Sequence, residues 1–112
     1  MSKRTMRPPS GETRSLEGAE VCTEAYLLIT GDRHAEYDHP FDDYTKVAEI
    51  FRAVTGVSLT VEQAVCFPLA MKLARMRTAR DQGRWHHDSV VDAIGYLGCL
   101  AMINKVSQGS HD

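Results

Sequence analysis

The chain has 112 residues, a formal net charge of −2, 43% hydrophobic residues and 25% charged residues. These values predict one globular domain, and they argue against a disordered chain and against the basic excess of a general nucleic-acid binder. The basic N-terminus leads into Pro8 and Pro9 without an apolar segment, so no secretory signal is expected. The longest apolar stretch, interrupted by Lys72 and Arg75, is shorter than the roughly 20 residues that cross a bilayer. We therefore expect a cytoplasmic protein without membrane or nucleic-acid partners.

The predicted organisation is one helical domain between two tails. Residues 1–14 are rich in Pro, Ser, Gly and basic residues and are expected to form a mobile tail, with 108–112 as a C-terminal tail and 15–107 as the domain. Ala19, Cys22, Tyr26 and Ile29 recur at steps of three and four. This spacing predicts an amphipathic helix from about residue 15 that ends near Gly31.

The next stretch, residues 31–44, has no clear period and predicts a long polar loop. Loops of that length often carry function. Its charged candidates are Arg33, Glu36, Asp38, Asp42 and Asp43. After Pro40, apolar residues at 44, 47, 48, 51 and 54 predict a second helix that ends at Gly56.

The third helix has the clearest start, because Thr60 followed by Gln63 forms a capping-box pattern. It extends to about Arg80, and Pro68 within it predicts a kink. A fourth helix is predicted from Asp88 or Ser89, as the N-cap, towards Lys105. No segment has the pattern of a strand. The fold class is therefore all-α: a single-domain antiparallel bundle of about four helices, with the polar loop between the first and second.

Four residues are expected in the core, three of them cysteines and one a tryptophan. Cys22, Cys66 and Cys99 lie among apolar neighbours without a partner at metal-ligand spacing, so we interpret them as small core residues in a reducing compartment. Trp85, the single tryptophan, is a core anchor or a stacking surface for a base, and the core is favoured. Because a chain of this size buries a modest core, burial in a homo-oligomer is expected.

Two acids carry the first candidate site. Asp88 and Asp92 lie four residues apart, so both project from one helix face. In a cleft, such a pair can share Mg²⁺, which then meets the phosphates of a substrate. The alternative is structural: Asp88 caps the helix and Asp92 favours its first turn through the helix dipole.

The second candidate site consists of two basic residues. Lys72 and Arg75 lie three apart within an apolar segment, where cations need partners. They either hold a phosphate or pair with Asp88 and Asp92 in an interhelical network. Beyond them lies a basic run formed by Arg77, Arg80 and Arg84. It is either a solvated helix face or a surface that attracts an anionic ligand. No nucleophile or general base stands out, so catalytic residues stay unassigned.

Several motifs resemble those of a family of small phage-encoded proteins of unassigned function, over about residues 18–105. They are Glu24-Ala25, Ile29-Thr30-Gly31-Asp32-Arg33, Tyr37, Pro40, Leu59-Thr60, Lys72-Leu73-Ala74-Arg75 and Asp88-Ser89-Val90-Val91-Asp92-Ala93-Ile94-Gly95-Tyr96. That family in turn looks similar to the all-α nucleoside triphosphate pyrophosphatases, the MazG-like group. The resemblance implies a helical, oligomeric, Mg²⁺-dependent protein in which four carboxylates from two helices hold metal against a triphosphate.

The chain departs from that group in its acids. The Asp88 and Asp92 pair resembles the second acidic helix with one extra residue of spacing, and Lys72 and Arg75 stand where the first would carry two acids. Asp38 also stands where the phage pattern usually has Gly.

Three hypotheses follow from these features. The first is Mg²⁺-dependent nucleotide hydrolysis, with Asp88 and Asp92 on the metal and Lys72, Arg75 and Arg33 on the phosphates. Acids of the loop, namely Glu36, Asp38, Asp42 and Asp43, would complete the metal shell. The second is sequestration of a nucleotide or nucleotide-derived ligand without catalysis. The third is a helical dimer that binds a host protein.

Overall fold

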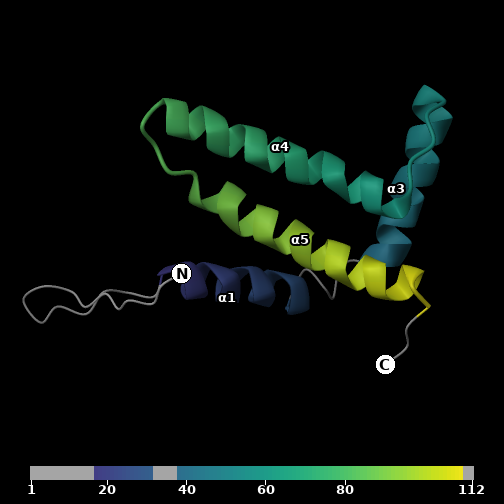
Figure 1. The fold of residues 1–112 in the computed structure, drawn as a ribbon, viewed down its shortest axis with the longest axis horizontal. Helices are drawn as coiled ribbons and strands as arrows, with labels where there is room; N and C mark the ends of the chain where they lie inside the picture. Colours follow the sequence, from purple (N-terminus) through teal and green to yellow (C-terminus); the bar gives the residue numbers. More distant parts are fainter. Residues whose placement is uncertain (1–16, 32–37, 110–112) are drawn as a thin grey trace, which may run out of the picture.

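The computed structural model describes residues 17–31 and 38–109, and these form four helices (Figure 1). The helices are α1 (Glu17–Thr30), α3 (Pro40–Thr55), α4 (Val61–Asp81) and α5 (His87–Ser107). No strand occurs in these two ranges, so the all-α prediction is confirmed. The predicted N-terminal tail and residues 32–37 of the predicted loop lie outside the described residues, as do residues 110–112.

Helix α5 is the centre of the arrangement. It forms an antiparallel hairpin with α4, and α1 runs along its other side in the same direction as α5 (Figure 1). Among the described helices, α1 contacts α5 alone, whereas α3 crosses the far end of the hairpin and contacts both α4 and α5. This open arrangement places the start of α3 beside the α1–α5 pair.

The ends of α3 follow from local chemistry, as predicted. Pro40 occupies its first turn, where the missing N–H costs no helical bond. His39 caps the helix, because its Nδ1 accepts the N–H of Phe41 at 3.0 Å. At the other end Gly56 has φ +79°, and its N–H donates to the carbonyl of Arg52 at 2.8 Å.

The predicted capping box of α4 is present. The N–H of Gln63 donates to Oγ1 of Thr60 at 3.0 Å, and the N–H of Thr60 donates to Oε1 of Gln63 at 2.9 Å. The helix continues through Pro68 to Asp81.

The predicted N-cap of α5 was wrong by two residues or more. The helix begins at His87, and its cap is His86, whose Nδ1 accepts the N–H of Ser89 at 3.3 Å. An imidazole nitrogen thus supplies the acceptor that the short side chains of Asp or Ser usually provide. Asp88 consequently lies in the first turn and favours it through the helix dipole.

The buried core consists mainly of small side chains. Apart from Ile103 and Val65, the buried apolar residues are Ala25, Ala64, Ala79, Val91 and Ala93. The expectation that the cysteines belong to this core was wrong for Cys22 and Cys66, which are exposed, whereas Cys99 is half-buried. Trp85 is also not a core residue, since 69% of it is exposed. These side chains lie exposed because four helices in an open arrangement leave many apolar positions uncovered.

Helix α5 is also long and apolar enough, by length and composition alone, to cross a membrane. The predicted longest apolar stretch, interrupted by Lys72 and Arg75, was the wrong segment, because residues 93–104 of α5 contain no charged residue. The core helix of a soluble protein passes the same test but is mostly buried, whereas 22% of the apolar window in α5 is buried. Here α5 contacts all three other helices.

Candidate functional site: a three-helix cleft

A cleft of about 290 Å³ opens between α1, the start of α3 and the middle of α5. We call it the three-helix cleft. Its walls are Ala25, Leu28 and Ile29 from α1, Asp38, Pro40, Asp43 and Tyr44 around the start of α3, and Val91, Asp92, Gly95, Tyr96 and Cys99 from α5. The volume is close to the lower end of the range for small-molecule sites.

Three of the predicted acids meet in this cleft. Asp38 precedes α3, Asp43 lies in its first turn and Asp92 lies on α5, so the fold brings together carboxylates about fifty residues apart in sequence. Two other candidates do not line it: Asp42 and Asp88, which are both exposed. Arg33 and Glu36 lie outside the described residues.

Lys72 pairs with one of these acids. Its Nζ lies 2.9 Å from Oδ2 of Asp92, and the two side chains are 20% and 24% exposed. Of the two alternatives for Lys72, the interhelical ion pair is therefore the one present. Arg75 is exposed and does not line the cleft.

A second ion pair lies at the edge of the cleft. Nζ of Lys46 donates to Oδ2 of Asp38 at 2.8 Å, with both side chains more than half exposed. The hydrogen bond from the ammonium group lowers the pKa of Asp38 and raises that of Lys46. Asp43 adds to the negative potential around Lys46. The cleft thus carries three carboxylates, two of them paired with lysines.

Sequence reasoning missed the aromatic walls, Tyr44 and Tyr96. Tyr96 follows Asp92 by four residues, so helical spacing alone places both on one face of α5. Tyr44 directly follows Asp43 at the start of α3. Gly98 brings α1 close, because a Cβ there would lie 3.1 Å from Cδ1 of Ile29.

A contact between α1 and α5 also escaped prediction. Nε2 of His87 lies 2.7 Å from Oε1 of Glu24, with both side chains about half exposed. The hydrogen bond with the Glu24 carboxylate raises the pKa of His87 above its usual value. Among the described helices α1 contacts α5 alone, so this pair lies in that one interface.

The described residues offer few side chains that could ligate a metal ion. Within residues 17–31 and 38–109, no three His, Cys, Asp or Glu side chains are grouped closely enough to form a metal site on their own. Mg²⁺ in nucleotide sites typically takes one or two carboxylates and completes its shell with phosphates and water. Asp43 and Asp92, which line one cleft, could supply these one or two carboxylate ligands.

Comparisons with known proteins agree with the phage resemblance. Gene 55 protein of Mycobacterium phage D29 is 29% identical over 83 residues, which cover 74% of this chain and 52% of the relative. Gene 55 protein of Mycobacterium phage L5 is 30% identical over 81 residues, covering 71% and 49%. The chain therefore spans about half the length of these curated relatives. No solved structure matches. A family model described as a domain of unknown function, DUF6378, matches residues 20–104, and the chain belongs to this family.

Proposed function

We propose that the three-helix cleft binds a nucleotide through a divalent cation and that the protein hydrolyses a nucleoside triphosphate to a monophosphate and pyrophosphate. The observation that carries the proposal is that Asp38, Asp43 and Asp92 line one cleft together with Tyr44 and Tyr96. Tyrosine rings suit a flat base or a ribose, and carboxylates suit a hard cation.

The charge of the cleft makes the cation necessary. Three carboxylates repel a bare triphosphate, and Lys46 and Lys72 are already paired with two of them. Asp43 and Asp92 would hold Mg²⁺ through their carboxylates, and the cation would supply the positive charge that the phosphates require. The bound cation would offset the negative charge that develops on the phosphates. The resemblance to the MazG-like group supports this choice of metal and substrate.

The residues of the chain then take distinct roles. Lys72, from α4, holds the carboxylate of Asp92 in place, since the two charged groups lie 2.9 Å apart. Tyr44 and Tyr96 bound the site on the base or sugar side. In the reaction a water oxygen bonds to the α-phosphorus, the bond from that phosphorus to the bridging oxygen breaks, and the water proton passes to solvent.

The test is a pyrophosphate-release assay over the common ribonucleoside and deoxyribonucleoside triphosphates with Mg²⁺ or Mn²⁺. Asp43→Asn and Asp92→Asn should each lower turnover at least tenfold. Asp42→Asn is the matched control, because Asp42 precedes Asp43 in the same turn without lining the cleft. Absence of turnover with every nucleotide would refute hydrolysis, and cation-dependent binding in calorimetry would then assign sequestration to the same cleft.

We also propose that the chain self-associates through α3, which has no buried residue. Val47, Ile50 and Val54 form a stripe on α3 and are 39%, 63% and 77% exposed. The stripe adjoins exposed apolar residues of α4, because the rings of Phe51 and Phe67 lie 5.3 Å apart. A helix of this length gains its stability from covering its apolar face, and a second copy supplies that cover without another protein.

A further inference from the structure

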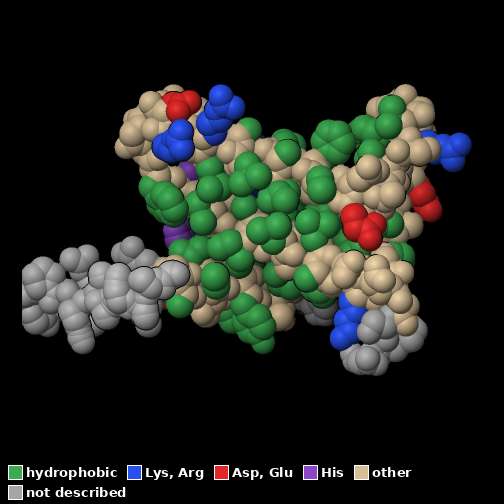
Figure 2. All heavy atoms as spheres, viewed as in Figure 1, with side chains coloured by type: hydrophobic (Ala, Val, Ile, Leu, Met, Phe, Trp, Pro, Cys, Tyr) green, Lys and Arg blue, Asp and Glu red, His purple; other side chains and the backbone are tan. Residues whose placement is uncertain are grey.

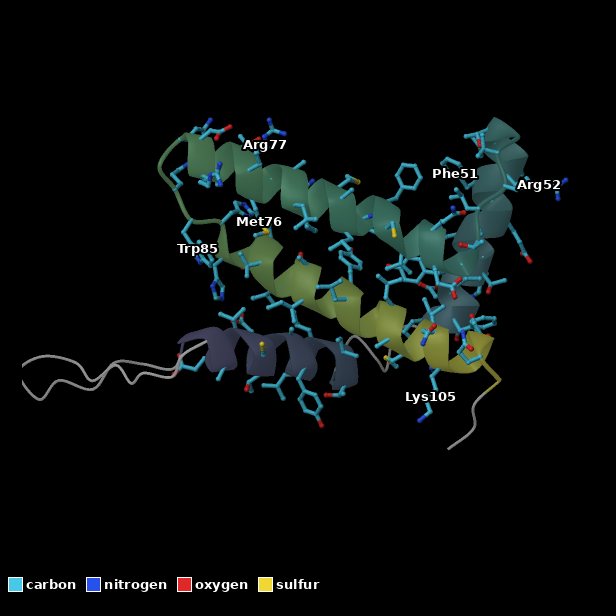
Figure 3. The ribbon with its side chains drawn as sticks, viewed as in Figure 1. Phe51, Arg52, Met76, Arg77, Trp85 and Lys105 are labelled. Atoms are coloured by element: carbon cyan, nitrogen blue, oxygen red, sulfur yellow. The ribbon has the colours of Figure 1, made fainter. Side chains whose placement is uncertain are left out.

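A second cleft, of about 390 Å³, lies at the hairpin end where α4 passes into α5. We call it the hairpin cleft. Its charged lining is Arg77, Arg80 and Arg84, and Trp85 lines it too. Figure 3 places Met76, Arg77 and Trp85 at this end of the hairpin, far from Arg52 and Lys105 at the other end. Figure 2 shows basic side chains gathered at the same end of α4.

The lining of the hairpin cleft is cationic and contains no acid. None of the three arginines forms an ion pair with a carboxylate among the described residues. Arg84 is oriented by Gln82, whose Oε1 accepts hydrogen bonds from Nε and Nη2 of its guanidinium group. Guanidinium groups bind phosphate through paired N–H donors, so the cleft is suited to a ligand with several negative charges.

His86 adds a donor to this lining. Its Nδ1 accepts the N–H of Ser89 in the α5 cap. In the neutral ring the proton therefore resides on Nε2, which becomes the donor. His86 lines the cleft, so the cap that starts α5 also fixes the tautomer of a cleft residue.

Trp85 indicates the rest of the ligand. Trp85 is 69% exposed although it borders a cleft with apolar surface from Met76 and Val90. An exposed indole beside arginines offers a flat face on which a nucleobase stacks. An anion without a ring would leave this face unused.

We propose that the hairpin cleft binds a nucleoside polyphosphate without a metal ion, with the base on Trp85 and the phosphates on Arg77, Arg80 and Arg84. A nucleic-acid strand is disfavoured, because the cleft has three cations and one aromatic ring, and the whole chain has a net charge of −2. This inference goes beyond the proposed function and rests on none of its residues. The two sites differ in sign: an acidic cleft that requires a cation, and a basic one that does not.

The experiment uses the fluorescence of Trp85, the only tryptophan in the chain. The probes are ATP, adenosine and inorganic tripolyphosphate, all titrated in excess chelator. ATP should quench the fluorescence with a saturable curve, because the base stacks on the indole. Tripolyphosphate should compete with ATP and quench less, and adenosine should bind at least tenfold more weakly than ATP because it lacks the phosphates.

The Kd for ATP in single variants tests whether binding depends on the hairpin cleft or on surface charge elsewhere. Arg80→Gln should raise the Kd for ATP at least tenfold, the loss expected for a charged hydrogen bond. Arg52→Gln and Lys105→Gln are charge-matched controls at the far end of the molecule and should leave it unchanged (Figure 3). Because the titrations contain excess chelator, the three-helix cleft, which requires a cation, does not contribute to them.

Three outcomes would overturn the proposal. One is the absence of saturable quenching by ATP. Another is an equal loss of affinity in Arg80→Gln and Arg52→Gln, which would indicate general charge attraction. The last is tighter binding of a thymidine oligonucleotide than of ATP, which would assign the cleft to a nucleic-acid strand.

Discussion

Lys72 on α4 and Asp92 on α5 form an ion pair of 2.9 Å across the hairpin, with both side chains largely removed from solvent. Asp92 also lines the three-helix cleft, which opens towards α1 and α3. The carboxylate therefore connects the packing of the hairpin to the candidate site. Lys72 is a cation beside a proposed metal site, and its role there is to hold the carboxylate of Asp92.

Removing Lys72 should destabilise the protein. Lys72→Met leaves the half-buried Asp92 without its cation, and we expect a loss of about 1–2 kcal/mol in the free energy of unfolding, reduced from the fully buried case by solvent. Urea denaturation measures it. Arg75→Met, at an exposed position one turn away, should change stability by less than about 0.5 kcal/mol. The double variant Lys72→Met with Asp92→Asn should recover part of the loss, and strict additivity would argue against coupling.

The contact between His87 and Glu24 predicts a pH-dependent docking of α1. Because the folded-state pKa of His87 is raised above 6.5, the contact stabilises fully below about pH 6.5 and loses its effect as pH rises through the folded-state value. Hydrogen exchange of α1 amides should therefore quicken as pH rises through that window, after correction for intrinsic rates. Both side chains are exposed, so the effect should be small.

The matched variants for that measurement are Glu24→Gln and His87→Gln. Each should remove the additional pH dependence of exchange in α1 while leaving α4 unaffected, because α1 packs on α5 alone among the described helices. A wild-type profile that is already flat between pH 5 and 8 would show that the pair does not hold α1.

The capping box predicts a specific loss at the start of α4. Thr60→Ala removes the acceptor for the N–H of Gln63, and we expect about 1 kcal/mol lower stability in thermal or urea unfolding. Thr60→Ser retains a hydroxyl and should lose much less. Equal losses in the two variants would point to the methyl group instead of the cap.

Self-association is tested on α3. Ile50→Lys places a charge in the exposed apolar stripe and should shift the sedimenting species to the monomer at micromolar concentration. Glu49→Lys, a charge change at the neighbouring exposed position, should retain the oligomer. A wild-type chain that sediments as a monomer would refute the proposed dimer and leave the stripe to another protein.

Sequence predicted the helices well where local chemistry decides their ends. Pro40, Gly56 and the Thr60–Gln63 box each act within one helical turn, so no tertiary information is needed. The N-cap of α5 was missed because histidine seldom fills that role. His86 was visible in the sequence, but nothing marked its ring as the acceptor.

Burial and partnership were less predictable, because they depend on which faces neighbouring helices cover. Trp85 was expected inside and lies exposed at the hairpin end. For Lys72 the sequence left two alternatives open, and only the antiparallel packing of α4 on α5 selects the ion pair. Tyr96 was recoverable from its spacing to Asp92, whereas Asp43 and Asp92 meet only through the fold.

Binding of a nucleotide with its cation in the three-helix cleft can be located by paramagnetic broadening in nuclear magnetic resonance. Mn²⁺ with a non-hydrolysable nucleoside triphosphate analogue is added to isotope-labelled Arg80→Gln protein, in which binding at the hairpin cleft is weakened at least tenfold. We expect selective loss of the amide signals around Asp43 and Asp92, with those around Trp85 retained. Uniform broadening, or broadening centred on any other part of the chain, would contradict it.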